Sequence, residues 1–266
     1  MHIVADIGGT NMRIAAASTD SLGEIKKLPT PKSPKEAMAE FVRLARELVG
    51  ERQITDVVCG IRWFVVDGIF LSGDGPLEAW GGLHLRKELS RALNAPVTII
   101  HDTAAVGLGE VYAGAGRGSK ICAYITVSTG VGGDRIVDGH IDRSTYHPEI
   151  GRQLVNGERL EDIVSGSAVQ RKFGIHPKEL DSLDERNKLA DTLAIGLYNT
   201  VMHWSPDTIV LGGSMIVGVN PIPIPRIQES LNKLLTIYPK PPVIKMAELG
   251  DNGGLWGGLA LLKQAE

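Results

Sequence analysis

The chain has 266 residues, of which 43% are hydrophobic and 22% charged, and its formal net charge is −3. This length suits one large domain or two small ones, with a core of ordinary size. The composition is typical of a globular protein, and the lack of a Lys/Arg cluster predicts no nucleic-acid partner. No apolar run reaches the length of a bilayer-spanning helix, so we expect no membrane association.

The sequence begins directly with an apolar strand and shows no basic leader with a cleavage site, which predicts a cytoplasmic location. Two isolated cysteines, Cys59 and Cys122, provide neither a disulfide framework nor metal-ligand spacing. Glycine is the unusual component, with 32 residues, many of them in pairs. Glycine pairs that follow strands are typical of backbone that approaches a ligand closely.

The first motif ends the N-terminal apolar strand with an acidic residue, two glycines and a hydroxyl. Asp6 places a carboxylate at the strand end, while Gly8 and Gly9 permit a tight turn. Thr10 adds a hydroxyl beside a backbone N–H, and together these groups suit a phosphate with its metal ion. A plain hairpin turn into a second strand over 12–17 is the alternative, and the two interpretations are compatible.

The elements that follow predict a mixed sheet with helices packed on it. We expect strands over 22–28, 54–61 and 97–100 and helices over 35–49 and 83–93. Ser33 is expected to cap the first of these helices, with Pro34 at its first position and Gly50 after its end. A short hairpin at 67–70 and a glycine-rich loop over 72–82 lie between the two helices. This order of elements is that of an α/β fold.

His101 and Asp102 follow the strand over 97–100, and 104–112 is expected to be helical. Asp102 therefore stands at the carboxyl end of a strand, the edge where open α/β sheets bind ligands. The alternative role is a cap of the following helix, which is a common position for aspartate.

A second half of the chain repeats the first motif. A strand over 121–127 runs into the glycine- and hydroxyl-containing turn 128–133, and a new strand follows. An internal duplication is therefore a hypothesis, with two domains that face each other across a cleft and hold one polyphosphate. The expected domains are 1–114 and 115–249, with the C-terminal helix 250–266 packed back on the first.

The remainder of the second half supplies charged residues and a third glycine turn. Glu149, Arg152 and Glu161 lie in a stretch without clear periodicity, which on its own is typical of a solvated loop. Gly212-Gly213-Ser214 follows another apolar strand. We expect helices over 164–173, 185–204, 227–235 and 255–263, a rigid linker over 221–225 and a strand over 243–247.

The three strand–glycine–hydroxyl turns and the strand-end Asp102 resemble the actin/hexokinase-type ATPase superfamily, and within it the ROK family (repressors, open reading frames, kinases). The resemblance extends over nearly the whole chain, and its motifs occur in the family's order. The matching segments are 6–10 and 128–133 for phosphate, 101–110 for the catalytic segment, 149–151 and 160–168 for the sugar, 209–214 for adenosine and 249–255 for the closing helix. The resemblance implies an α/β fold of two ribonuclease H-like domains, each with a mixed sheet flanked by helices.

The resemblance also implies an ATP-dependent kinase that phosphorylates a sugar hydroxyl, with the 6-hydroxyl of a hexose such as glucose as the first choice. It implies that Asp102 is the general base, that Asp6 holds Mg²⁺ through water, and that ATP and Mg²⁺ are the cofactors. The implied ATP- and phosphate-binding residues are Asp6, Gly8, Gly9, Thr10, Asn11, Thr129, Gly130, Gly132, Gly212, Gly213 and Ser214. The implied acceptor-binding residues are His101, Asp102, Glu149, Arg152 and Glu161.

The chain departs from the family pattern at the position of a structural zinc site. That site uses a histidine after Glu-Ile-Gly and a following run of cysteines. Here Arg152 stands at the histidine position and the segment 155–159 contains no cysteine, so the usual zinc ligands are absent. We therefore predict no zinc.

Other departures fall mainly on the sugar side. His101 replaces a usual asparagine, and the family segments that correspond to 61–64 and 75–80 are altered. In the nucleotide motifs, Ser128 and Asp134 replace common glycines. The nucleotide half therefore follows the family closely, while the identity of the acceptor stays open.

Three alternatives remain. The first is a kinase for an N-acetylhexosamine or another polyol. The second is a nucleotide- or sugar-binding pseudokinase, which the sugar-side changes favour and the intact Asp6 and Asp102 oppose. The third is a sugar-sensing repressor, which would carry a helix-turn-helix ahead of the first phosphate motif, where this sequence leaves no room. Family members are commonly dimers, so a homodimer is the expected assembly.

Overall fold

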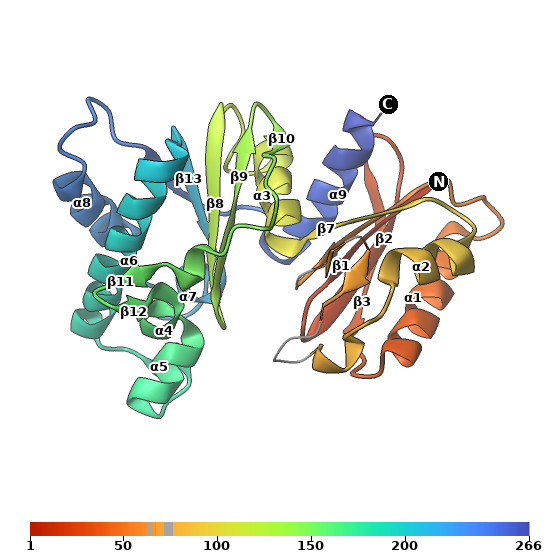
Figure 1. The fold of residues 1–266 in the computed structure, drawn as a ribbon, viewed down its shortest axis with the longest axis horizontal. Coiled ribbons are helices and arrows are strands. Elements are labelled where there is room, and N and C mark those ends of the chain that lie inside the picture. Colours follow the sequence, from red (N-terminus) through yellow and green to blue (C-terminus); the bar gives the residue numbers. More distant parts are fainter. Residues whose placement is uncertain (63–64, 67, 72–76, 266) are drawn as a thin grey trace. The chain divides into compact units, whose positions relative to one another are not determined.

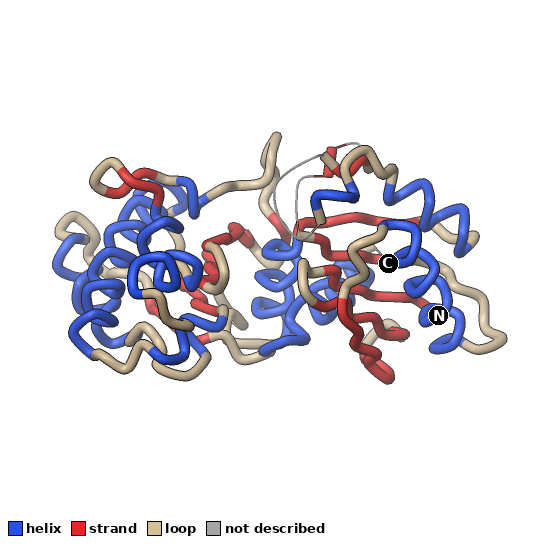
Figure 2. Tube along the Cα trace, turned by 90° about the horizontal axis from the view of Figure 1, so that it is seen from below, coloured by secondary structure: helices blue, strands red, loops and turns tan. Residues whose placement is uncertain are grey.

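The computed structural model describes residues 1–62, 65–66, 68–71 and 77–265. They form two compact units: unit 1 consists of Met1–Gly109 and Asp251–Glu266, and unit 2 of Glu110–Gly250. Each unit contains a five-stranded mixed sheet, and helices flank the strands in both (Figure 2). The predicted mixed α/β class is therefore confirmed. Among the described residues, no helix is both long and apolar enough to cross a bilayer.

The sheet of unit 1 has the strand order β3-β2-β1-β4-β7. Its first three strands in the chain are antiparallel, whereas β4 and β7 run parallel to β1. The strands are β1 (His2–Ile7), β2 (Asn11–Ala17), β3 (Leu22–Pro29), β4 (Val57–Ile61), β7 (Val97–His101) and the small pair β5 (Val65–Val66) and β6 (Ile69–Phe70). The helices are α1 (Pro34–Val49), α2 (Leu85–Leu93), α3 (Asp102–Ala113), α9 (Gly253–Gln264) and the single turns η1 (Glu78–Trp80) and η4 (Gly250–Asn252).

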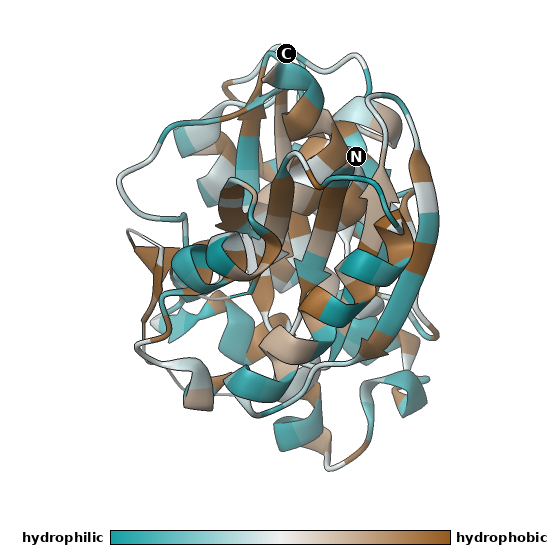
Figure 3. Ribbon diagram, turned by 90° about the vertical axis from the view of Figure 1, so that its right-hand side faces the viewer, coloured by the Kyte–Doolittle hydropathy of each residue, from teal (hydrophilic) through white to brown (hydrophobic). Residues whose placement is uncertain are grey.

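Strand β1 is buried on both faces, and its alternating side chains contact different helices. Ile3 and Ile7 belong to the core beneath α1 and α2, whereas Val4 packs with Leu255 and Leu259 of α9. Figure 1 shows α1 and α2 on one side of these strands and α9 on the other, and Figure 3 shows the strands mostly in the hydrophobic colour. Because side chains alternate along a strand, Asp6 lies on the same face as Val4, toward α9.

The predicted helix over 35–49 is confirmed together with its caps. The hydroxyl of Ser33 accepts a hydrogen bond from the backbone N–H of Glu36, and Pro34 occupies the first turn. Gly50 ends the helix with a positive φ of 61°. A hydroxyl cap of this kind stabilises a helix by about 1 kcal/mol.

The sheet of unit 2 has the strand order β10-β9-β8-β13-β14. The strands are β8 (Ile121–Val127), β9 (Val131–Val137), β10 (His140–Ile141), β13 (Thr208–Gly212), β14 (Val243–Met246) and the small pair β11 (Leu154–Val155) and β12 (Glu158–Arg159). The helices are α4 (Leu160–Val164), α5 (Gly166–Phe173), α6 (Leu183–Trp204), α7 (Ser214–Val217), α8 (Ile224–Leu234) and the single turns η2 (Ile150–Arg152) and η3 (Pro177–Glu179).

The two sheets have the same topology. In each unit three antiparallel strands in chain order are followed by two strands parallel to the first. The turn between β8 and β9 therefore occupies the same place in unit 2 as the turn between β1 and β2 in unit 1. This correspondence supports the hypothesis of an internal duplication.

Two predicted elements of unit 2 are wrong in detail. The helix expected over 164–173 begins two residues later as α5, because Ser165 has an extended backbone and its hydroxyl caps α5 through the N–H of Ala168, and the short helix α4 before it was not predicted. The rigid linker expected over 221–225 ends early, because α8 begins at Ile224 with Pro225 in its first turn. Proline is well tolerated there, since the first-turn N–H groups have no partner within a helix.

Candidate functional site

Two carboxylates lie at the carboxyl edge of the sheet in unit 1. Asp6 is the second-last residue of β1, and Asp102 directly follows β7. Strand β4 runs between these two strands. The residue of β4 opposite Asp6 is Gly60, where a Cβ would lie 3.7 Å from Asp6 Oδ1 and 3.2 Å from the Cβ of Ala105. The missing side chain leaves the two carboxylates without an intervening group from β4.

The Asp6 carboxylate is partly enclosed by β2 and by the start of α9. Arg13 is its register partner across the hairpin, and Arg13 Nη1 lies 3.8 Å from Asp6 Oδ2. A second carboxylate, Asp251, accepts from Arg13 Nη2 at 2.6 Å and from Lys27 Nζ at 3.1 Å. A Cβ at Gly254 would lie 3.1–3.4 Å from the Asp6 side chain, so α9 approaches this carboxylate closely.

Burial and, after it, the negative charge of Asp102 raise the pKa of Asp6 to about 7, against the lowering effect of Arg13. A single arginine therefore does not fully offset the charge of the two carboxylates. Carboxylate oxygens are the ligands that Mg²⁺ prefers, and a cation here would relieve the repulsion. The donor set at this edge thus fits a hydrated magnesium ion.

Asp102 is the first residue of α3, and its carboxylate is held from two sides. Its Oδ1 accepts from the backbone N–H of Thr103 at 2.8 Å and lies 3.0 Å from Nδ1 of His101. Burial would raise the pKa of Asp102, but the hydrogen bond and charge of His101, the charge of Arg62 and the Thr103 N–H together hold it below its usual value. Asp102 is consequently ionised at neutral pH, oriented, and about a quarter exposed, at 26%. His101, expected to contact the acceptor, is a partner of Asp102.

The turn after β1 is closed by backbone hydrogen bonds. The N–H of Gly8 donates to the carbonyl of Asn11 at 3.0 Å, and a Cβ at Gly8 would lie 3.2 Å from that oxygen. Thr30 supports the turn from β3, because its hydroxyl donates to the carbonyl of Gly8 and its N–H to that of Thr10. Thr10 itself is exposed and Gly9 is half-buried. The hairpin is therefore confirmed, and phosphate binding by the exposed Thr10 stays a prediction.

The matching turn of unit 2 is joined to α5. Ser128 N–H donates to the carbonyl of Gly130, while the Ser128 carbonyl accepts from Gly166 and that of Thr129 from Ser167. The first N–H groups of α5 are therefore used by the turn itself. Gly132, also predicted for phosphate, lies within β9 opposite Thr126.

The third predicted turn follows β13, and its glycines are required by the packing of the chain itself. A Cβ at Gly212 would lie 2.8 Å from the hydroxyl of Tyr124. Gly213 has φ 86° and ψ 158°, and a Cβ there would lie 2.3 Å from the carbonyl oxygen of Val127. Ser214 then begins α7.

We expect Gly213→Ala to destabilise the protein by about 3 kcal/mol or more, because it combines a glycine-only backbone conformation with a backbone clash. Gly139→Ala is the matched control. Gly139 also has a positive φ, 78°, but nothing lies within 4 Å of a Cβ there, so its cost is strain alone, about 1 kcal/mol. Urea denaturation measures both values, and equal losses would contradict the clash at Val127.

A pocket of about 140 Å³ in unit 2 brings two of the predicted turns together. Thr129 and Ser214 line it, and so do the helix α5 and the segment before and within η3. The further lining residues include Gln170, His176, Pro177, Lys178 and Met215. The apolar side chains of Pro177 and Met215 beside polar groups suit a flat ring with hydrogen-bonding edges. Sequence reasoning identified the turns but missed the residues from α5 and η3.

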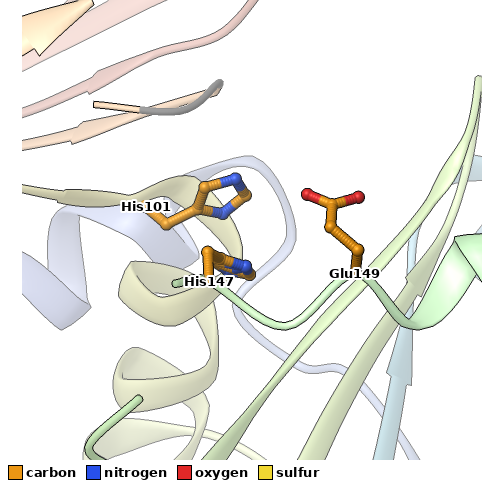
Figure 4. Close-up of side chains that lie close together, drawn as sticks. All are labelled: His101, His147 and Glu149. Atoms are coloured by element: carbon orange, nitrogen blue, oxygen red, sulfur yellow. The ribbon is translucent and has the colours of Figure 1, made fainter. Parts of the chain in front are cut away.

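Glu149 and Arg152 flank the single turn η2, and their side chains form a loose pair with 3.6 Å between Arg152 Nε and Glu149 Oε2. Glu161 lies in α4, where its Oε2 would be 3.2 Å from a Cβ at Gly130. Both η2 and α4 pack against β9, so the acceptor-side residues predicted in unit 2 lie near its phosphate turn. Figure 4 shows His147 and Glu149 on the same connecting segment, and His101 at the end of β7.

The histidine and cysteines of the family's structural zinc site have no counterparts at Arg152 and in the segment 155–159. The two cysteines of this chain are buried in different sheets, Cys59 in β4 and Cys122 in β8. Burial raises the pKa of both thiols, that of Cys122 to about 12, so neither provides a ready thiolate. The segment after Arg152 instead forms the hairpin β11–β12 with Asn156 and Gly157 at its turn, both with positive φ.

Some relevant residues were not predicted, and some predictions cannot be placed. Arg13 could have been identified, because a tight hairpin at 8–10 sets it opposite Asp6. The dipeptide Asn156-Gly157 between short strands was also a readable hairpin signal. The parts of the altered segments at 63–64 and 75–76, residue 67 of the predicted short hairpin and the first part of the predicted loop, 72–76, lie outside the described residues.

Comparison with known proteins identifies the family of this chain. Residues 2–265 match the ROK family. A Clostridium perfringens protein of uncharacterized function is 28% identical over 99% of this chain and 98% of its own length. The fructokinase of Zymomonas mobilis is 25% identical over 97% of this chain and 95% of its own length.

Solved structures show the same fold. The ROK hexokinase of Thermus thermophilus aligns with a TM-score of 0.88 at 23% identity, over 99% of each chain. A ROK glucokinase of Streptomyces griseus, solved with glucose and AMPPNP, aligns with a TM-score of 0.78 at 20% identity, over 100% and 99% of the two chains. A Listeria monocytogenes protein provisionally assigned as an N-acetylmannosamine kinase aligns with a TM-score of 0.80 at 19% identity, over 100% and 99%. The chain belongs to the ROK family and has its actin/hexokinase-type fold.

Proposed function

We propose that the chain transfers the γ-phosphate of ATP to the 6-hydroxyl of a hexose such as glucose, with Asp102 as the general base. The coarser class, an ATP-dependent sugar kinase, follows from the ROK family and from the kinase names of relatives that match over most of their length. The observation that carries the proposal is the ionised, oriented Asp102 beside Asp6 at the carboxyl edge of the sheet.

In the proposed reaction the sugar oxygen attacks the γ-phosphorus, the bond from phosphorus to the ADP oxygen breaks, and the hydroxyl proton passes to the Asp102 carboxylate. Its lowered pKa makes Asp102 a weak base, but in a loose transition state the proton leaves late, so orientation matters more than basicity. The Thr103 N–H and His101 supply that orientation.

Asp6 is the proposed residue for Mg²⁺, through water, because it offers oxygen ligands and a charge that Arg13 alone does not offset. Mg²⁺ would neutralise developing charge on the phosphate oxygens. The turns at Gly8-Gly9-Thr10-Asn11 and Thr129-Gly130 would donate N–H and hydroxyl groups to phosphate. The pocket lined by Ser214, Pro177 and Met215 would receive the adenosine.

Glu149, Arg152 and Glu161 are the proposed acceptor residues in unit 2. A second candidate acceptor is an N-acetylhexosamine. It is favoured by Arg152, which adds a long cationic side chain, half-exposed at 50%, where the family commonly has a histidine. We also propose that the protein is a homodimer, as family members commonly are, and that it is located in the cytoplasm.

An acceptor panel tests this function. We expect ATP- and Mg²⁺-dependent ADP release with glucose, fructose, mannose or their N-acetylated amines, measured in a coupled assay. The position of the new phosphate, assigned by ³¹P NMR, distinguishes the 6-hydroxyl from others. ATP binding without turnover on any acceptor would favour the pseudokinase instead.

A further inference from the structure

The buried pair of Asp134 and His147 in unit 2 has no role in the proposed chemistry. Asp134 lies in β9, and His147 lies in the segment that leads to Glu149. Nε2 of His147 is 3.2 Å from Oδ2 of Asp134, and the two side chains are only 10% and 5% exposed. A buried pair of this kind is costly to form and is therefore expected to constrain the structure around it.

His147 is held at both ring nitrogens. Nδ1 lies 2.9 Å from the carbonyl oxygen of Pro148, which can only accept, so Nδ1 donates to it. Nε2 faces the Asp134 carboxylate. Asp134 is fixed in turn, because its Oδ1 accepts from the N–H of Arg135 at 2.8 Å. The imidazole ring is thus held between a strand carboxylate and the backbone just before Glu149.

The same segment contacts β9 at two further points after Glu149. The side chain of Ile150 packs over Gly133, where an added Cβ would lie only 2.7 Å from Cδ1 of Ile150. A Cβ at Gly151 would lie 2.3 Å from the carbonyl oxygen of Val131, so the backbone itself touches the strand there. Glu149 is therefore bracketed, with His147 as the anchor on one side and η2 as the anchor on the other.

We propose that Asp134 and His147 are a positioning pair that holds residues 147–152 against β9 and thereby fixes how Glu149 presents its carboxylate to the acceptor sugar. The pair acts through Glu149 and does not itself touch the sugar. The effect on sugar affinity rests on the proposed function of Glu149, whereas the anchoring of the segment does not.

The variants that test the pair are Asp134→Ala, Asp134→Asn, His147→Ala and the double alanine variant. Asn keeps an oxygen that accepts from Nε2 and should retain part of the wild-type behaviour. The double variant leaves no unpaired buried charge and stays interpretable if a single alanine variant fails to fold. Asp191→Asn is the control, because it breaks the Arg226–Asp191 pair between α6 and α8 in the same unit.

Hydrogen exchange and kinetics with glucose are the two measurements. We expect amide exchange over 149–153 to rise about fivefold or more in the alanine variants, and the KM for glucose to rise about tenfold while the KM for ATP stays within about twofold. The exchange rate and the KM for glucose in the double variant should be no higher than in the more strongly affected single variant, because each single substitution already removes the same interaction. Asp191→Asn should leave both readouts unchanged.

Unchanged exchange over 149–153, or a fall in melting temperature with no change in the KM for glucose, would overturn the positioning role. If the wild-type chain phosphorylates none of the acceptors in the panel, the proposed function fails. The exchange comparison needs no acceptor, and in that case it alone decides whether the pair anchors the segment.

Discussion

Replacing Asp102 with asparagine is expected to lower kcat by about 10²-fold or more and to leave ATP binding within about twofold. Asparagine keeps the size of the side chain and can still accept from the Thr103 N–H, so the start of α3 should be unchanged. What it loses is the negative charge and the capacity to take the hydroxyl proton. Steady-state kinetics and nucleotide binding by calorimetry measure the two effects.

The matched control is Asp56→Asn. Asp56 lies just before β4, at the amino-terminal edge of the same sheet, and its Oδ2 is 3.2 Å from Nδ1 of His2. The kcat of Asp56→Asn should equal that of the wild type. Wild-type turnover by Asp102→Asn, with intact folding, would refute the assignment of the base.

Replacing Asp6 with asparagine is expected to stabilise the protein at pH 8 in the absence of Mg²⁺ and nucleotide, although it impairs the proposed magnesium site. The pKa of Asp6 is raised from 3.8 to about 7 in the folded state. Between these values the folded chain holds a proton that the unfolded chain has released, so stability falls as the pH rises from about 4 to 7. Asparagine cannot ionise and escapes this loss, which is on the order of 2–4 kcal/mol above pH 7.

The pH dependence is the decisive part of this prediction. The advantage of Asp6→Asn should be small at pH 4, where the folded wild type is protonated and only about half of the unfolded chains have released the proton. Asp251→Asn serves as the control of opposite sign. Hydrogen bonds from Arg13 and Lys27 hold the pKa of Asp251 below its usual value, so its charge favours folding at neutral pH. Urea denaturation of the three proteins at pH 4, 6 and 8 tests both signs, and a pH-independent effect of Asp6→Asn would contradict the raised pKa.

The sequence predicted the local elements well because their signals are short-range. The cap of α1 at Ser33, the hairpin between β1 and β2, and the repeated turn after β8 each depend on residues within a few positions of one another. Errors arose where a local pattern allowed two outcomes. The apolar spacing allows a helix from 164, and only the extended backbone of Ser165 makes α5 begin at Gly166.

The candidate site was predictable in its residues and only partly in its partners. The sequence placed Asp6 and Asp102 at strand ends, and the parallel order of β1, β4 and β7 then brings those ends to one edge. It did not predict that Nδ1 of His101 contacts Asp102 and Thr103, and the assignment of His101 to the acceptor stays a prediction. The turn glycines Gly212 and Gly213 were predicted to bind a ligand. The structure shows that a side chain at either position would collide with β8, so the packing of the chain itself requires glycine there.

The sequence by itself determined the alternation of strands and helices, the two glycine turns and the carboxylates that end their strands, since all of these depend on periodicity and on the backbone preferences of neighbouring residues. Only the tertiary structure decided what surrounds those carboxylates. Asp251 and Gly254 approach Asp6 from the far end of the chain, and Asp134 meets His147 across a strand and a loop. Such contacts are set by register and packing between distant segments, and no local pattern specifies them. Burial between such segments is also the largest cause of the raised pKa of Asp6.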